Sequence, residues 1–123
     1  MENALALVVG SVAGGFARWI FSGRVGRLMG GGFPWGTFVV NLSACFLIGL
    51  FDSLAEVRFA LTPAARILLM TGFCGAYSTF STFIMETAKL IQSGQPVWAL
   101  ANFFGSGLAG IALFWFGAAL GRI

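Results

Sequence analysis

The sequence contains no histidine, few charged residues and only two cysteines. Of its 123 residues, 9% are charged and 59% are hydrophobic. A soluble domain carries about a quarter charged residues, so this chain cannot cover a water-facing surface. Without histidine it lacks the commonest general base and metal ligand at neutral pH. Cys45 and Cys74 both fall in apolar segments, which favours small core residues over metal ligands or a disulfide.

Long apolar segments make up most of the chain and predict an all-α integral membrane protein. A helix needs about 20 residues to cross the hydrocarbon of a bilayer. Four segments qualify, at residues 3–22, 34–54, 62–92 and 96–121. The connections between them are short, so we expect a single transmembrane domain over residues 1–123. In the first span, Gly10 and Gly14 have the spacing that lets two membrane helices pack closely.

The third segment is long for one straight crossing and contains a stretch that is unusual for a membrane helix. Residues 72–83 read GFCGAYSTFSTF. Two glycines weaken the helix there, and the hydroxyl side chains that follow compete for backbone hydrogen bonds. Broken backbone survives in a bilayer only where protein or a water-filled path surrounds it. We therefore predict that this helix is broken near residues 75–79 and that the break forms a functional site.

Neutral polar side chains are the candidates for lining a path through the membrane. Amide and hydroxyl hydrogens can replace the water around a small anion, and the rims of phenylalanine rings carry partial positive charge. The candidates are Asn41, Phe80, Ser81, Thr82, Phe83, Asn102 and Ser106. The alternatives are that Asn41 only joins two helices and that the two rings only fill a core. Free carbonyl oxygens at the break could instead coordinate sodium.

Two charged residues each have two interpretations. Arg18, beside Trp19, is either a snorkelling arginine at the membrane interface or a residue that concentrates anions in a vestibule. Glu86 lies either at the mouth of a pore or at the interface as a partner of Lys89. For Glu86 we favour the pair with Lys89, because residues three apart on a helix are neighbours.

Basic residues are divided almost evenly between the two sides of the membrane. Four spans place three of them on one side and four on the other: Arg58, Arg66 and Arg122 against Arg18, Arg24, Arg27 and Lys89. Such a chain can insert in both orientations, and opposed copies can pair as an antiparallel dimer. A single orientation set by weaker cues is the alternative. The net charge of +3 suggests contact with anionic lipid headgroups rather than nucleic acid.

Residues 72–83 resemble the third-helix signature of the Fluc (CrcB) fluoride channels. The similarity extends to GGFARW at residues 14–19 and to GTFVVN at residues 36–41, so it covers essentially the whole chain. The resemblance implies four-helix subunits with a broken third helix, which form antiparallel, dual-topology homodimers. It also implies a multi-pass protein of the bacterial inner membrane that exports fluoride passively.

The same resemblance implies roles for individual residues. Phe80 and Phe83 would be the paired rings that face fluoride, and Asn41 would be the amide of the pore. Hydroxyl groups along the pore would come from Ser81, Thr82 and Ser106. Arg18 would lie near the aqueous entrance. In the fourth span, Phe104 stands where the family pattern leads us to expect a tyrosine.

A structural sodium ion at the dimer centre is the one cofactor that the resemblance implies. Gly75 and Ser78 of each subunit would hold it through their backbone carbonyl oxygens. Many members of the family have threonine in place of Ser78, a change that a backbone ligand tolerates. No organic cofactor is expected.

Three other functions fit the sequence less well. A small multidrug antiporter needs a membrane-buried carboxylate in its first span, where this chain has only Glu2 at the very start. A scaffold subunit would give the hydroxyl-rich break no purpose. An enzyme would need a nucleophile with its base, or a metal cluster, and the sequence contains no such pattern.

Overall fold

The computed structural model describes residues 1–123 and contains helices but no β-strand. The first, second and last spans are α1 (Glu2–Met29), α2 (Trp35–Glu56) and α6 (Pro96–Arg122). The third comprises α3 (Pro63–Arg66), the π-helical η1 (Ile67–Cys74), α4 (Gly75–Tyr77) and α5 (Phe80–Gln92). Four helical stretches are long and apolar enough to cross a membrane. The chain is therefore a multi-pass membrane protein.

Several helix boundaries follow from local sequence signals. The Thr62 side chain accepts a hydrogen bond from the Ala65 amide at 3.2 Å, and Pro63 occupies the first turn of α3. Pro96 opens α6 in the same way. Helix α1 continues past residue 22 to Met29, because nothing interrupts it before the glycines at 30–32. Its 28 residues span about 42 Å, so its C-terminal end extends beyond the hydrocarbon.

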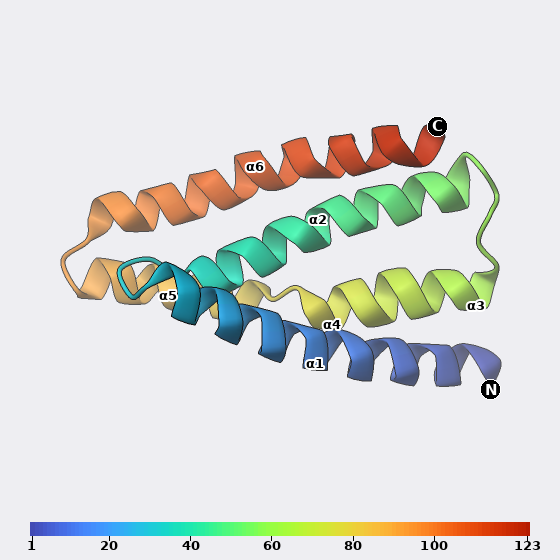
Figure 1. The fold of residues 1–123 in the computed structure, drawn as a ribbon, viewed down its shortest axis with the longest axis horizontal. Coiled ribbons are helices and arrows are strands. Elements are labelled where there is room, and N and C mark those ends of the chain that lie inside the picture. Colours follow the sequence, from blue (N-terminus) through green and yellow to red (C-terminus); the bar gives the residue numbers. More distant parts are fainter.

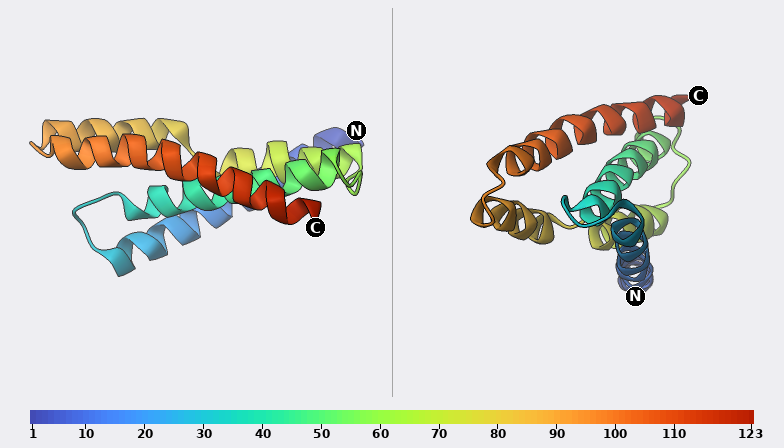
Figure 2. Two further views of the ribbon diagram at one scale, coloured as in Figure 1. Left: turned by 90° about the horizontal axis from the view of Figure 1, so that it is seen from above. Right: turned by 60° about the vertical axis from the view of Figure 1, so that its left-hand side comes forward.

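The four spans run alternately in opposite directions. Figure 1 shows both termini and the connection at residues 57–62 at one end of the molecule. The connections at residues 30–34 and 93–95 lie at the other end. Helices α2 and α6 lie side by side, and α1 packs against η1 and α4. In Figure 2, α5 and the first half of α6 diverge from the end of α1 and the start of α2.

Glycines bring α1 into direct contact with the backbone of the third segment. A methyl group at Gly10 would collide with the carbonyl oxygen of Leu68, and one at Gly14 with that of Phe73. The close helix packing predicted from these two glycines is thus confirmed. Comparable contacts join α2 and α6, through Gly49, Gly117 and Gly121.

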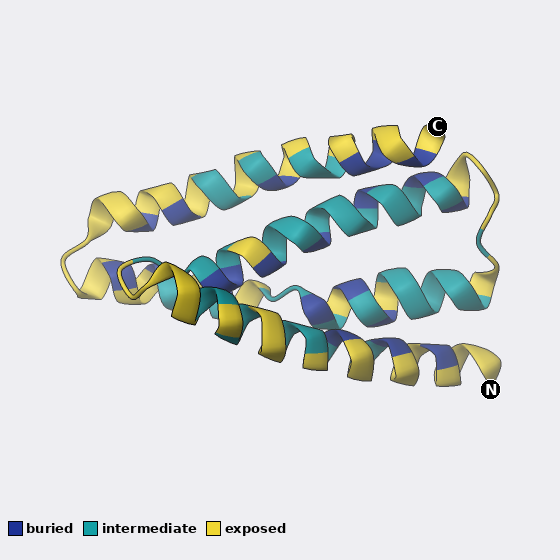
Figure 3. Ribbon diagram, in the orientation of Figure 1, coloured by how far each residue is buried: buried dark blue, intermediate teal, exposed yellow.

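Buried residues lie on the faces that the helices turn toward one another. Figure 3 shows exposed residues along the outer sides of α1 and α6. Many of these are large apolar side chains, such as Phe16, Trp19, Leu108 and Trp115. Apolar side chains on an outer face suit contact with lipid, because lipid tails are as apolar as the side chains.

Candidate functional site

The backbone of the third segment is extended at two consecutive residues. Helix α4 ends at Tyr77, and α5 begins at Phe80. Between them Ser78 has φ −78° and ψ 160°, and Thr79 has φ −150° and ψ 115°. The thin trace between α4 and α5 in Figure 1 is this interruption.

Asn41 of α2 binds the interrupted backbone with both ends of its side-chain amide. Its Nδ2 donates to the Thr79 carbonyl oxygen at 3.1 Å, and its Oδ1 accepts from the Thr79 amide at 2.8 Å. A primary amide matches a peptide group in this way, so Asn41 satisfies a backbone donor and a backbone acceptor together. Its second N–H remains free for another acceptor. Asn41 thus connects two helices and also lines the groove described below.

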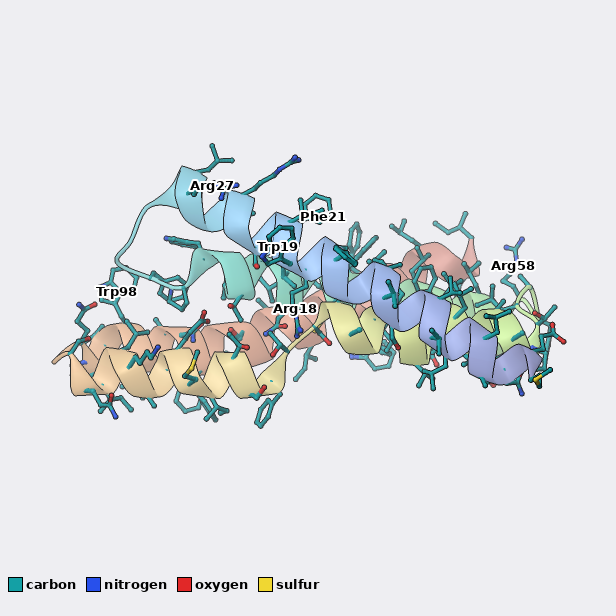
Figure 4. All side chains as sticks on the ribbon, turned by 90° about the horizontal axis from the view of Figure 1, so that it is seen from below. Arg18, Trp19, Phe21, Arg27, Arg58 and Trp98 are labelled. Carbon is teal, nitrogen blue, oxygen red and sulfur yellow. The ribbon has the colours of Figure 1, made fainter.

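The interruption deprives the carbonyl oxygens of residues 75–78, including those of Gly75 and Ser78, of their usual helical donors. In a continuous α-helix the Gly75 oxygen accepts from the Thr79 amide, but that amide donates to Asn41. The Ser78 oxygen would accept from the Thr82 amide, but that amide donates to Thr79 Oγ1 at 3.3 Å. Arg18 Nη1 donates to the Ser78 oxygen instead, also at 3.3 Å. Figure 4 shows Arg18 beside the interruption.

A groove of about 420 Å³ lies next to the interruption, between α2, α5 and α6. It contains no charged residue. Its lining consists of Asn41, Cys45, Ser78, Thr79, Phe80, Phe83, Phe103, Ser106 and Gly107. The groove therefore combines hydroxyl and amide groups with aromatic rings.

The two rings at the start of α5 differ in their surroundings. The ring centroids of Phe80 and Phe83 lie 6.0 Å apart, with 43° between the ring planes. Phe80 is 75% exposed in the single chain, whereas Phe83 is 8% exposed. Phe83 also stacks on Phe103 of α6, at 5.9 Å and 22°. One ring is therefore held by its own subunit, while the other projects away from it.

The other candidate hydroxyl and amide groups differ in their burial and in their hydrogen-bond partners. Ser106 Oγ is 3.5 Å from Asn102 Oδ1, as expected for residues four apart on one face of a helix. Asn102 itself is buried, and its Nδ2 donates to Thr87 Oγ1 at 2.9 Å. The Thr82 hydroxyl accepts from Thr79 Oγ1 at 3.0 Å. Ser81 is exposed, and its side chain makes no hydrogen bond within the chain.

Glu86 does not form the predicted ion pair with Lys89, and that prediction is wrong. Glu86 Oε1 accepts instead from Thr37 Oγ1 of α2 at 2.9 Å. The chain has one ion pair, which joins Arg66 and Glu56. The side of α5 that carries Glu86 packs toward α2, so a hydroxyl on another helix is a nearer partner than the neighbouring lysine.

Five of the predicted site residues lie together in the groove: Asn41, Ser78, Phe80, Phe83 and Ser106. The other five, Arg18, Gly75, Ser81, Thr82 and Asn102, do not line it. Gly75 lines a separate cavity of about 340 Å³ together with Ser78. The predictions missed Cys45, Thr79, Phe103 and Gly107. Of these, Thr79 had a signal in the sequence, because it stands inside the run of hydroxyl residues.

Residues 5–118 match the family described as "CrcB-like protein, Camphor Resistance (CrcB)". The chain belongs to the CrcB family. A CrcB relative from Maridesulfovibrio salexigens, named fluoride-specific ion channel FluC, is 41% identical over 123 residues. That alignment covers all of this chain and 98% of the relative. A protein of the same name from Nitratidesulfovibrio vulgaris strain DP4 is also 41% identical, over all of this chain and 99% of its own length.

A further CrcB relative, from Bradyrhizobium diazoefficiens, is named fluoride-specific ion channel FluC 2. It is 44% identical over 105 residues, which cover 83% of this chain and 76% of the relative. The resemblance based on residues 72–83 is therefore confirmed at the level of the family.

Proposed function

We propose that this chain is the subunit of a fluoride channel. The observation that carries the proposal is the groove in which Asn41, Ser106 and two phenylalanine rings meet beside an interrupted membrane helix. Its relatives named fluoride-specific ion channels support the same conclusion. The chain is not an enzyme, since the family is one of channels.

Uncharged groups suit the passage of a small anion. Fluoride must lose bound water to enter the groove, and each lost hydrogen bond to water needs a replacement from the protein. Hydroxyl groups and the free Asn41 N–H donate hydrogen bonds, and the rims of Phe80 and Phe83 carry partial positive charge. None of these groups has a full charge that would trap the ion in a deep well. In this proposal Ser81, Thr82 and Ser106 supply hydroxyls along the path.

Arg18 is the cationic residue next to the interruption. Its guanidinium reaches the Ser78 carbonyl oxygen, so its side chain points toward the third segment. A fixed positive charge there raises the local concentration of anions. We place Arg18 near the aqueous entrance of the path, where it attracts fluoride without lining the groove.

The direction of transport follows from the chemistry of hydrogen fluoride and the membrane potential. Hydrogen fluoride crosses lipid uncharged and ionises in the more alkaline cytoplasm, where fluoride accumulates. An inside-negative potential drives the anion outward, with about 2.3 kcal/mol per charge for every 100 mV. Passive export through a bacterial inner membrane therefore needs neither a coupling ion nor ATP.

The functional unit in this proposal is an antiparallel, dual-topology homodimer. The balance of basic residues allows the chain to insert in both orientations. Phe80 lines the groove and is 75% exposed in the single chain, so the groove lacks a wall on that side. A second, inverted subunit would supply the wall and would pair two discontinuous third spans at the dimer axis.

Sodium fits the carbonyl oxygens of Gly75 and Ser78. Both oxygens lose their helical donors at the interruption, and hard neutral oxygens suit a hard monovalent cation. Arg18 occupies one lone pair of the Ser78 oxygen and leaves the other free. Two oxygens from each subunit would hold the ion at the dimer centre. When bound, sodium supplies a fixed positive charge that ties the two third spans together.

A fluoride-electrode assay on purified protein in liposomes tests the proposal. We expect rapid fluoride efflux when potassium and valinomycin set the potential, and negligible chloride efflux under the same gradient. Protein-free liposomes are the control for leakage of hydrogen fluoride. Fluoride efflux no faster than in those liposomes would contradict the proposed function.

A further inference from the structure

Helix α5 is attached to the rest of the chain differently from the other membrane helices. It contains no glycine, and no glycine of another helix packs against its backbone. Side-chain hydrogen bonds join α5 and the residue before it to their neighbours. Thr79 binds Asn41, Glu86 binds Thr37, and Thr87 binds Asn102.

The bond between Thr87 and Asn102 is the most deeply buried of the three. Asn102 is 1% exposed and Thr87 is 9% exposed. Asn102 Nδ2 donates to Thr87 Oγ1 at 2.9 Å, and Thr87 Oγ1 donates in turn to the Phe83 carbonyl oxygen at 2.8 Å. The threonine hydroxyl thus links α6 to the backbone of the residue whose ring lines the groove.

Two consecutive residues of α6 hold two positions of α5 that lie one turn apart. Asn102 holds Thr87, and Phe103 stacks on the Phe83 ring. A helix fixed at two points one turn apart cannot rotate about its own axis, so the direction of the Phe83 ring is fixed as well. Ser106, one turn further along α6, lines the groove and approaches Asn102.

We propose that Asn102 and Thr87 are positioning residues, whose buried hydrogen bond holds the Phe83 ring at the groove. Asn102 acts through Thr87 and does not contact the ion, because it is 1% exposed, donates to Thr87 and does not line the groove. This inference rests on the proposed fluoride conduction. It adds a pair of residues on which the rate of conduction depends although neither lines the groove.

Thr87→Val tests the pair with little change in side-chain shape. Valine lacks the hydroxyl, so Asn102 Nδ2 loses its acceptor. We expect fluoride efflux per reconstituted dimer to fall about threefold to tenfold, the range for one interhelical hydrogen bond in a membrane protein. Thr87→Ser keeps the hydroxyl and should restore efflux to within about twofold of wild type.

Ser53→Ala is the matched control. Ser53 Oγ donates to the Ala118 carbonyl oxygen at 2.7 Å, so this variant also loses a buried bond to α6, but in the half of the molecule distant from the groove. We expect its efflux per dimer to equal that of wild type. Wild-type efflux from Thr87→Val, or an equal loss from Ser53→Ala, would overturn the proposal.

A double-mutant cycle separates positioning from direct contact with the ion. If Asn102 acts through Thr87, Thr87→Val combined with Asn102→Leu should conduct no less than the weaker single variant. If Asn102 binds fluoride itself, the two losses should multiply, and the proposal is then wrong.

A spectroscopic measurement keeps this test independent of the proposed function. With 4-fluorophenylalanine in place of Phe83, Thr87→Val should shift or split the fluorine resonance, and Ser53→Ala should not. An unchanged resonance in Thr87→Val would overturn the positioning role even if the wild-type chain transported no fluoride. Absence of wild-type transport alone would overturn the proposed function.

Discussion

The two halves of the third span are held in the membrane by different forces. Before the interruption, residues 67–77 pack against α1, where Gly10 and Gly14 allow contact between backbones. After it, α5 has no such contacts; hydrogen bonds join α5 and the preceding Thr79 to other helices, and Phe83 of α5 stacks on Phe103. The first half is held mainly by close backbone packing, and the second depends more on its polar side chains.

This difference matches the chemistry that each half must perform. Between helices in lipid, close packing and interhelical hydrogen bonds replace the hydrophobic effect. A half that only supports the structure can rely on close packing. A half that lines a path for an anion needs polar groups, and each polar group in the membrane needs a partner. The hydrogen bonds that satisfy the polar side chains of α5 therefore also hold this helix against α2 and α6.

The largest expected effect comes from breaking the packing of the first half. In Gly14→Ala the new methyl group would collide with the Phe73 carbonyl oxygen, so the backbones must separate. We expect a loss of about 3 kcal/mol or more in stability, measured by thermal unfolding in detergent. Gly15→Ala is the control, because no atom lies within 4 Å of its added methyl group. Equal stability of the two variants would refute the packing between α1 and η1.

Replacement of the rings tests the second half with a smaller change in stability. Phe80→Ile should lower fluoride efflux at least about tenfold, because isoleucine has no ring edge to present to an anion. Its thermal unfolding should stay near that of wild type, since Phe80 is 75% exposed in the single chain and in the dimer would border the ion path rather than a packed core. Phe83→Ile should lower efflux similarly and also destabilise the protein. Unchanged efflux in both variants would remove the rings from the mechanism.

The smallest expected effect is that of sodium removal. Sodium bound at ten times its Kd stabilises the folded dimer by about 1.4 kcal/mol. We expect the dimer to unfold at a temperature a few degrees lower in potassium-only buffer than in sodium buffer. Lithium and N-methylglucamine at the same ionic strength control for general salt effects. The same unfolding temperature in all four buffers would speak against a sodium site at Gly75 and Ser78.

Hydropathy and local motifs were sufficient to predict the helical content, the four spans and the start of α3 at Pro63. The two residues with extended backbone, Ser78 and Thr79, lie within residues 75–79, where the glycines and hydroxyl residues favour a break. The spacing of Gly10 and Gly14 predicted close packing but could not identify η1 as the partner. Hydropathy also could not indicate the π-helical geometry of residues 67–74. An apolar segment has the same mean hydropathy whether its backbone hydrogen bonds join residues four apart or five apart.

The partners of polar side chains were the part that the sequence could not supply. Asn41 binds Thr79, 38 positions later in the chain, and only the packing of α2 on the third span brings them together. Glu86 shows the same limit, because its partner Thr37 lies on another helix, whereas local spacing favoured Lys89. Phe103 was missed as a groove residue because nothing in its neighbourhood distinguishes it from a lipid-facing aromatic residue.

Measuring fluoride efflux from the Asn41→Leu and Ser43→Ala variants compares the two halves of the third span directly. Both residues lie on α2. Asn41 binds Thr79 at the interruption, and the Ser43 hydroxyl bonds that of Tyr77 in the first half at 2.9 Å. We predict that efflux per folded dimer falls at least about tenfold in Asn41→Leu and stays within about twofold of wild type in Ser43→Ala. Equal efflux from the two variants would contradict the assignment of conduction to the half held by polar groups.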